Sequence, residues 1–216
     1  MSAEDRAFFD ERCEELISAS KLSDVNLAHY SLQLLRKRGM LHLMGSRYID
    51  LAFWACSNVK DSRADVVAED LYDIMMISKD TCAVPLVVFE RAMKICANRQ
   101  NLQFALRLEQ DINTFKYDLT EPFLASLIDV LCQFNGSGRY LGKIEGYYNQ
   151  YKEISAKNNF KKSIRLVFGK MAQMYCDLGE GENARTVLRE MIEARFVPWE
   201  RLCDSLMVSA IREGNG

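Results

Sequence analysis

"RLVFGKMAQMYCDLGEGENARTVLREMIEARFVPW", residues 165–199, contains two helical patterns joined by a Gly-Glu-Gly turn. On both sides of the turn, apolar residues recur at the spacing of an amphipathic helix. The part "LGEGEN" could also be a phosphate-cradling loop that opens a helix, but it lacks the preceding strand and the Lys-Ser/Thr ending of such a loop. Its glycines are therefore interpreted as the tight turn between two helices. The stretch predicts a helical hairpin.

The rest of the chain has the same character. The segments "LAHYSLQLLRK", "AEDLYDIMM" and "FLASLIDVLCQF" place apolar residues at helical spacing, and no run alternates as a strand does. Short polar turns such as "ANRQN" and "FNGSG" separate these patterns. The sequence therefore predicts an all-α protein made of helical hairpins. We expect hairpins at about 3–38, 45–78, 86–115, 121–156 and 165–195, followed by a lone helix at 200–213.

The hairpin at 165–195 shares residues with earlier segments in the same order. Phe168, Cys176, Ala184 and Met191 align with Tyr48, Cys56, Ala68 and Met75, and Phe89, Cys96 and Ala105 form another partial copy. Self-similarity of this kind indicates a repeat protein, in which each hairpin buries a face against its neighbours. A further copy begins near Cys203. We expect either a fragment of a longer array or a last helix that caps the stack or docks on a partner.

The segment 165–199 resembles a pentatricopeptide repeat (PPR). It has that family's length of 35 residues, and it matches the family at Phe168, Met171, Cys176, Gly179, Ala184, Met191 and Pro198. Residues 86–120 have the same length with fewer matches, and the other units are degenerate. Tetratricopeptide repeats, of about 34 residues, are the near neighbour, but the cysteine and the closing proline favour the PPR type. The resemblance implies a single domain over 1–216, a right-handed α-solenoid of about five hairpins plus a terminal helix.

The resemblance also implies a role in organellar RNA processing, stability or translation. In this family, each repeat reads one RNA base with the residue after the early aromatic and with the last residue of the repeat. Those positions hold Ile49, Glu90, Ala125, Gly169 and Asp204 in the first series, and Thr120 and Trp199 in the second. Ile49, Ala125 and Gly169 have no hydrogen-bonding side chain to offer, and Glu90 would repel phosphate. We therefore expect no clean base-reading code.

Five of these residues remain candidates for contact with RNA or with a protein partner: Glu90, Thr120, Gly169, Trp199 and Asp204. Trp199 ends a repeat where the family usually has a polar residue, and it could either stack on a ligand or cover the following helix. A group of four tyrosines, Tyr140, Tyr147, Tyr148 and Tyr151, could stack on bases as well. Packing is the favoured interpretation of these tyrosines.

Two basic stretches contain candidates for contact with phosphates. The first holds Lys157, Lys161, Lys162, Arg165 and Lys170, and the second holds Arg36, Lys37 and Arg38. Such groups bind a phosphate backbone by counterion release, without sequence preference. Basic residues late in a helix also complement its dipole and keep loops soluble. The role in complementing the helix dipole and keeping loops soluble is favoured, and contact with phosphates stays open.

Composition argues against several other classes of protein. A formal net charge of -2 supplies no global field that would attract polyanions. Seven cysteines occur without a C-x-x-C pair and beside only two histidines, so neither a metal site nor a cofactor is expected. No apolar run approaches the roughly 18 residues of a membrane span. Because no constellation of catalytic residues is found either, we expect a binding module without catalysis, membrane or metal.

Two functions remain open. The first is association with single-stranded RNA, largely through its backbone. The second is a protein scaffold or structural subunit of a larger assembly, such as a mitochondrial ribosome. The resemblance favours RNA association, which is preferred. The negative net charge, and the residues at the base-reading positions that differ from those usual in the family, favour the scaffold. A mitochondrial or plastid location follows from the resemblance alone, because the acidic start is unlike a transit peptide, and the cytoplasm is the alternative.

Overall fold

The computed structural model describes residues 1–57, 64–77, 84–157 and 163–214. Within these ranges it contains eleven α-helices, one 3-10 helix (η1, Leu41–Leu43) and no strand. The prediction of an all-α protein is therefore confirmed. The α-helices are α1 (Ala3–Leu22), α2 (Val25–Lys37), α3 (Ser46–Ser57), α4 (Ala64–Ile77), α5 (Leu86–Arg99), α6 (Leu102–Thr114), α7 (Glu121–Gln133), α8 (Leu141–Lys157), α9 (Ser163–Leu178), α10 (Gly181–Glu193) and α11 (Glu200–Gly214).

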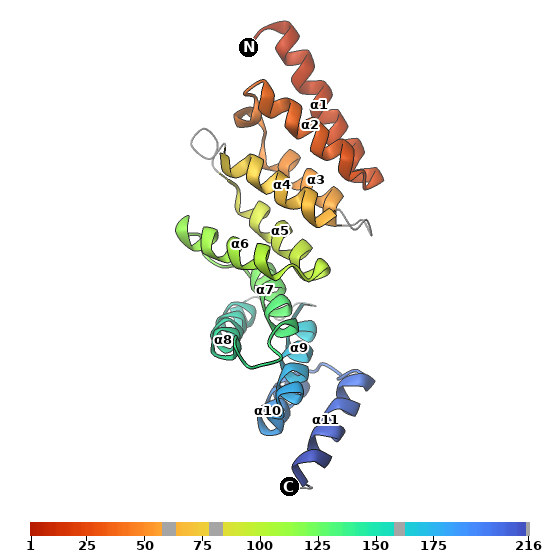
Figure 1. Ribbon diagram of the computed structural model, residues 1–216, viewed down its shortest axis with the longest axis vertical. Helices are drawn as coiled ribbons and strands as arrows, with labels where there is room; N and C mark the ends of the chain where they lie inside the picture. The colour runs from red at the N-terminus through yellow and green to blue at the C-terminus, as the bar shows by residue number, and fades with distance from the viewer. Residues whose placement is uncertain (58–63, 78–83, 158–162, 215–216) are drawn as a thin grey trace. The chain divides into compact units, whose positions relative to one another are not determined.

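The chain divides into two compact units, unit 1 (Met1–Tyr117) and unit 2 (Asp118–Gly216), and each is described by itself. Unit 1 contains α1 to α6, and unit 2 contains α7 to α11 (Figure 1). The continuation of a single stack of hairpins through both units stays a prediction.

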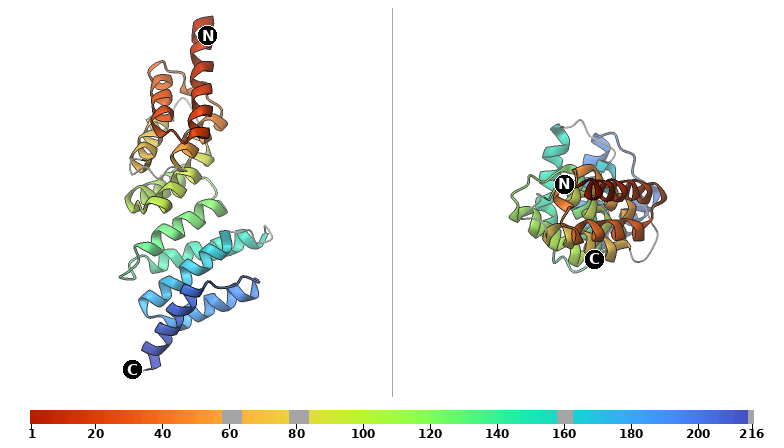
Figure 2. Two further views of the ribbon diagram at one scale, coloured as in Figure 1. Left: turned by 90° about the vertical axis from the view of Figure 1, so that its right-hand side faces the viewer. Right: turned by 90° about the horizontal axis from the view of Figure 1, so that it is seen from above.

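Unit 1 consists of three hairpins, α1/α2, α3/α4 and α5/α6, whose helices pack in pairs. The first helices form one layer, because α1 contacts α3 and α3 contacts α5. The second helices form another, because α2 contacts α4 and a side chain of α4 binds α6. The paired helices of each hairpin can be followed in both side views (Figure 1, Figure 2). We call these the first-helix layer and the second-helix layer.

Unit 2 has the same kind of arrangement. The helices α7 and α8 pack as one pair, and α9 and α10 as another. In the first-helix layer α7 contacts α9, and in the second-helix layer Tyr148 of α8 binds Glu190 of α10. The helix α11 packs on α9 and α10 and so joins the first-helix layer of this unit.

Three of the hairpins turn by the same local device. The residue after the first helix has a left-handed backbone, with φ of 54° at Ser23, 58° at Gln100 and 77° at Gly179. In two hairpins the next residue, Asp24 or Asn101, accepts a hydrogen bond from a backbone N–H three residues later and so caps the second helix. Glycine adopts this backbone without steric cost. The Gly-Glu-Gly stretch is thus the turn between α9 and α10.

An aromatic cluster lies between the second and third hairpins of unit 1. The fully buried ring of Phe89 on α5 lies edge-on to three others, with centroid distances of 5.8 Å to Tyr72 and 5.9 Å to both Phe115 and Tyr117. The Tyr117 hydroxyl donates to the carbonyl oxygen of Val84 at 2.8 Å. Each edge-to-face ring pair adds about 0.5–1.5 kcal/mol to the effect of burial. The cluster therefore joins the second and third hairpins.

A tyrosine and a carboxylate link successive second helices in both units. The Tyr72 hydroxyl of α4 donates to Asp111 of α6 at 2.8 Å, and the Tyr148 hydroxyl of α8 donates to Glu190 of α10 at 2.7 Å. Burial and the bonded carboxylate raise the pKa of both hydroxyls above the ordinary value for tyrosine. Both hydroxyls therefore stay protonated near neutral pH and serve as donors.

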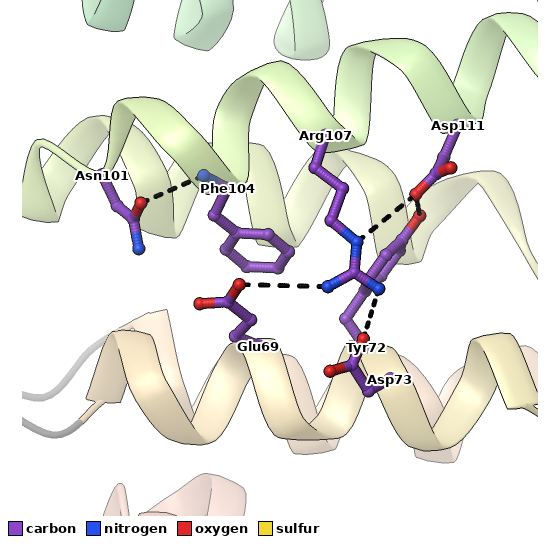
Figure 3. A network of polar contacts seen from close by, with 7 residues as sticks. All are labelled: Glu69, Tyr72, Asp73, Asn101, Phe104, Arg107 and Asp111. Atoms are coloured by element: carbon purple, nitrogen blue, oxygen red, sulfur yellow. Dashed lines mark hydrogen bonds and ion pairs between the residues drawn. The ribbon is translucent and has the colours of Figure 1, made fainter.

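Arg107 strengthens this link in unit 1. Its guanidinium binds Asp73 and lies 3.9 Å from Glu69, both on α4, and it lies 3.8 Å from Asp111 on its own helix (Figure 3). The guanidinium also lies 5.3 Å from the ring centroid of Tyr72. The hydrogen bond with Asp73 raises the pKa of Arg107 further. The network fixes the register of α4 against α6.

Candidate functional site

Two of the predicted contact residues lie against each other in unit 2. Gly169 is buried on α9, and the outer ring of the Trp199 indole lies so close that a Cβ at Gly169 would overlap it. Trp199 stands between α10 and α11 and is partly exposed. The indole thus covers the preceding first helix, whereas the sequence suggested a ligand or the following helix. In this repeat, the two positions that PPR proteins use for reading a base touch each other.

Replacing Gly169 by alanine is expected to displace the Trp199 indole, because the added methyl group has no room beside it. We expect a loss of about 1–3 kcal/mol in the free energy of unfolding, as for other overpacked sites. In a Trp54→Phe background, the emission of Trp199 should move to longer wavelength. Urea unfolding and fluorescence measure the two effects.

Gly146→Ala is the matched control, because Gly146 lies within α8 and a Cβ there meets no atom within 4 Å. Alanine at an open helix position should stabilise the protein by up to about 1 kcal/mol. If the Gly169→Ala variant had the same stability and the same Trp199 emission as its parent with Gly169, the indole would not rest on Gly169.

The other predicted contact residues are dispersed. Glu90 is half-buried on α5 and belongs to unit 1, unlike the other four candidates. Thr120 precedes α7 as its N-cap residue without capping it through its side chain. Asp204 is exposed on α11. Of the five candidates, the structure thus shows Gly169 and Trp199 in contact.

Of the six predicted phosphate-contact residues that the structure describes, two bind acidic side chains of the chain itself. The Lys170 ammonium lies 2.6 Å from Asp129, and the Arg38 guanidinium lies 3.7 Å from Asp5 and 4.0 Å from the ring centroid of Phe8. These contacts neutralise part of the predicted basic surface. Four others are exposed: Arg36, Lys37, Lys157 and Arg165. Lys161 and Lys162 lie outside the described residues.

An exposed tryptophan with two neighbouring cations lies in the first-helix layer of unit 1. Trp54 of α3 is 38% exposed. From α5, the Arg91 guanidinium lies 4.6 Å and the Lys94 ammonium 5.9 Å from its ring centroid. Asp50 accepts a hydrogen bond from Arg91 at 2.7 Å and so holds the guanidinium in place. We call Trp54, Arg91 and Lys94 the Trp54 patch; its aromatic face can stack on a base while its cations attract phosphates.

Helical periodicity does not reveal the Trp54 patch, because its members lie far apart along the chain. Trp54 stands in "LAFWACS", an apolar run that is typical of a buried helix face. The two cations of the patch, Arg91 and Lys94, follow about one repeat later in the sequence. The alignment of Tyr48 with Phe89 was the signal that could have found the patch, since it sets the two first helices side by side.

A polar cavity of about 220 Å³ lies between α8 and α10 in unit 2. The residues around it bind one another: the Tyr175 hydroxyl donates to Glu145 at 2.7 Å, and the Lys152 ammonium lies 3.0 Å from Glu190. Lys152 also lies 4.5 Å from the ring centroid of Tyr148, which is bonded to the same glutamate. We interpret this cluster as the unit 2 counterpart of the network around Arg107.

Buried cysteines recur near the ends of first helices, at Cys56, Cys96 and Cys176. Burial raises the pKa of the Cys56 thiol to about 12 and that of Cys96 above its ordinary value. Both thiols are therefore protonated at neutral pH and weakly nucleophilic. Among the described residues, no group of three or more His, Cys, Asp or Glu could hold a metal ion.

In the part of the chain that the structure describes, no helix combines the length and the apolar character needed to cross a bilayer. Neither models of known protein families nor curated proteins match this chain. The PPR resemblance therefore stays a prediction that rests mainly on residues 165–199.

Proposed function

We propose that this protein is a non-catalytic helical-repeat binding module that associates with single-stranded RNA in mitochondria or plastids. Its hairpins form a PPR-like right-handed α-solenoid that continues through both units. The observation that carries the proposal is the Trp54 patch, in which a partly exposed indole lies beside two cations on the first-helix layer.

The patch suits a flexible single strand better than a duplex. Unpaired bases expose their faces, and stacking on an aromatic side chain contributes about 1–3 kcal/mol per base. Lys94 is exposed and free to approach a phosphate, while Arg91 is held beside the indole by Asp50. Stacking tolerates any base, so the patch supports binding without sequence preference.

Base-by-base reading is not part of the proposal. Gly169 has no side chain to offer, and the Trp199 indole lies against it in place of a polar group. Recognition then depends on the RNA backbone and on stacking, which makes affinity strongly dependent on salt.

Lys94→Glu tests the electrostatic part of this proposal. Each phosphate contact with a single strand contributes about 0.7 to the slope of log affinity against log salt. We expect the variant to bind a short oligouridylate more weakly at low salt, with a slope reduced by about that amount. Fluorescence anisotropy of labelled RNA at several salt concentrations measures both quantities.

Arg6→Glu is the matched control, because it changes the net charge equally at an exposed position of α1. It should leave the slope unchanged. Equal losses of RNA affinity in the two variants would mean that net charge alone governs binding. No binding of the wild-type chain at low salt would refute RNA association.

A second candidate function, a protein scaffold or structural subunit, is favoured by the pairing of basic residues within the chain. Lys170 with Asp129 and Arg38 with Asp5 reduce the charge available for phosphates. A scaffold should retain its protein partner after ribonuclease treatment. Loss of the partner on that treatment would assign the association to RNA.

A further inference from the structure

Arg91 of the Trp54 patch is held by one edge of its guanidinium. The Nε–H donates to Oδ1 of Asp50 at 2.7 Å, and the Cζ atom lies over the Trp54 indole, 4.6 Å from the ring centroid. The side chains of Arg91 and Asp50 are 26% and 31% exposed, so both are half-buried. A guanidinium has five N–H donors, and the bond to Asp50 uses the one on Nε. The N–H groups on Nη1 and Nη2 are left for other contacts.

Arg107 shows how the chain uses an arginine that only joins its own helices. Its Nη1 lies 3.9 Å from Glu69, its Nη2 binds Asp73, and its Nε lies 3.8 Å from Asp111. All three nitrogens of that guanidinium therefore face carboxylates. Among the described residues, Arg91 forms an ion pair with one acid, through Nε. Its two Nη groups are thus not engaged in neutralising the chain's own acids.

Lys94 places a second cation beside the same indole. It stands three residues after Arg91 on α5, a spacing that sets two side chains next to each other on a helix. Its ammonium lies 5.9 Å from the ring centroid of Trp54. A guanidinium binds two oxygens of a phosphate through parallel hydrogen bonds, and an ammonium adds a point charge. The patch therefore offers contacts for the base and the phosphate of one nucleotide.

We infer that Arg91 binds a backbone phosphate of single-stranded RNA through its two Nη groups, and that Asp50 is the positioning residue that aims them. This inference rests on the proposed function. Asp50 carries a charge that repels RNA, but it holds the guanidinium beside the ring on which a base stacks. Fixing a side chain before binding reduces the entropy that binding costs. An acidic side chain is thus expected to strengthen the binding of a polyanion.

Asp50→Ala separates positioning from charge repulsion, because the two roles predict opposite results. Loss of a repelling charge alone should tighten binding of a short oligouridylate. Loss of the positioning bond should weaken binding about 2- to 10-fold, the usual contribution of one hydrogen bond. The slope of log affinity against log salt should also fall by up to about 0.7, the share of one phosphate contact. Fluorescence anisotropy measures both quantities, and urea unfolding checks that the variant is folded.

Two further variants separate the contacts of the Arg91 guanidinium. Asp50→Asn keeps an acceptor oxygen for the Nε–H and removes the repelling charge, so it should bind RNA at least as tightly as the wild type. Arg91→Lys keeps the charge but loses the paired Nη groups, so it should bind about tenfold more weakly. Asp10→Ala is the matched control, because Asp10 is an exposed acid on α1 of the same unit. It should not weaken binding.

Two results would overturn the inference and leave RNA association intact. The first is an Asp50→Ala variant that binds the RNA as tightly as the wild type or more tightly. The second is equal affinity of the wild type and Arg91→Lys. Equal weakening by Asp50→Ala and Asp50→Asn would also overturn it, since the acceptor oxygen would then not matter. No binding by the wild type at low salt is a separate result, which would refute the proposed function together with this inference.

Discussion

Phe89→Ala is expected to lower the free energy of unfolding of unit 1 by about 3–5 kcal/mol, the usual cost of removing a buried phenyl ring. The ring is fully buried and contacts Tyr72, Phe115 and Tyr117. Its loss leaves a cavity between the second and third hairpins, and the usual total stability of a domain is only about 5–15 kcal/mol. Urea unfolding followed by the emission of Trp54, in a Trp199→Phe background, reports on unit 1.

Tyr30→Ala is the matched control in the same unit, because Tyr30 is an exposed aromatic residue on α2. Exposed substitutions of this kind usually change stability by no more than about 0.5 kcal/mol. A loss below about 1 kcal/mol for Phe89→Ala would contradict the assignment of the aromatic cluster as the join between the second and third hairpins.

Trp54→Ala is expected to weaken binding of a short oligouridylate about 5- to 150-fold, which corresponds to the loss of one stacked base. The substitution removes the aromatic face and leaves Arg91 and Lys94 without their ring partner. The salt dependence should change little, because both cations remain. Anisotropy titrations of labelled RNA at several salt concentrations measure the affinity and its slope.

Trp54→Phe separates stacking from general disturbance of the surface. A phenyl ring still stacks, so this variant should lose much less affinity than the alanine variant. If phenylalanine and alanine weakened binding equally, stacking on the ring would not be the basis of RNA contact.

The hairpins could be predicted from sequence because local rules decide them. The helices α9 and α10, at Ser163–Leu178 and Gly181–Glu193, lie close to the expected 165–195. Helical periodicity shows which face is buried, and Gly179 permits the left-handed backbone of the turn. These signals act within a few residues, so a single sequence is enough to recognise them.

The surface could not be predicted in the same way, because it depends on contacts between repeats. Lys170 is a candidate for contact with phosphates in the sequence, yet Asp129 of the neighbouring first helix binds it. Gly169 and Trp199 are separate contact candidates in the sequence, yet they touch each other in the structure. The Trp54 patch joins α3 to α5 in the same manner. Charge pairs and ring contacts between residues about 30 to 40 positions apart depend on how the repeats stack on each other. Helical periodicity alone does not give that stacking.

The most direct test of RNA association is the fluorescence of Trp54 itself. The chain has two tryptophans, so a Trp199→Phe variant leaves Trp54 as the single reporter. We predict that a short oligouridylate added at low salt quenches this emission to saturation, and that the quenching is reversed as salt is raised. Binding of the RNA with unchanged Trp54 emission would contradict contact at the Trp54 patch, and no binding at low salt would contradict the proposed function.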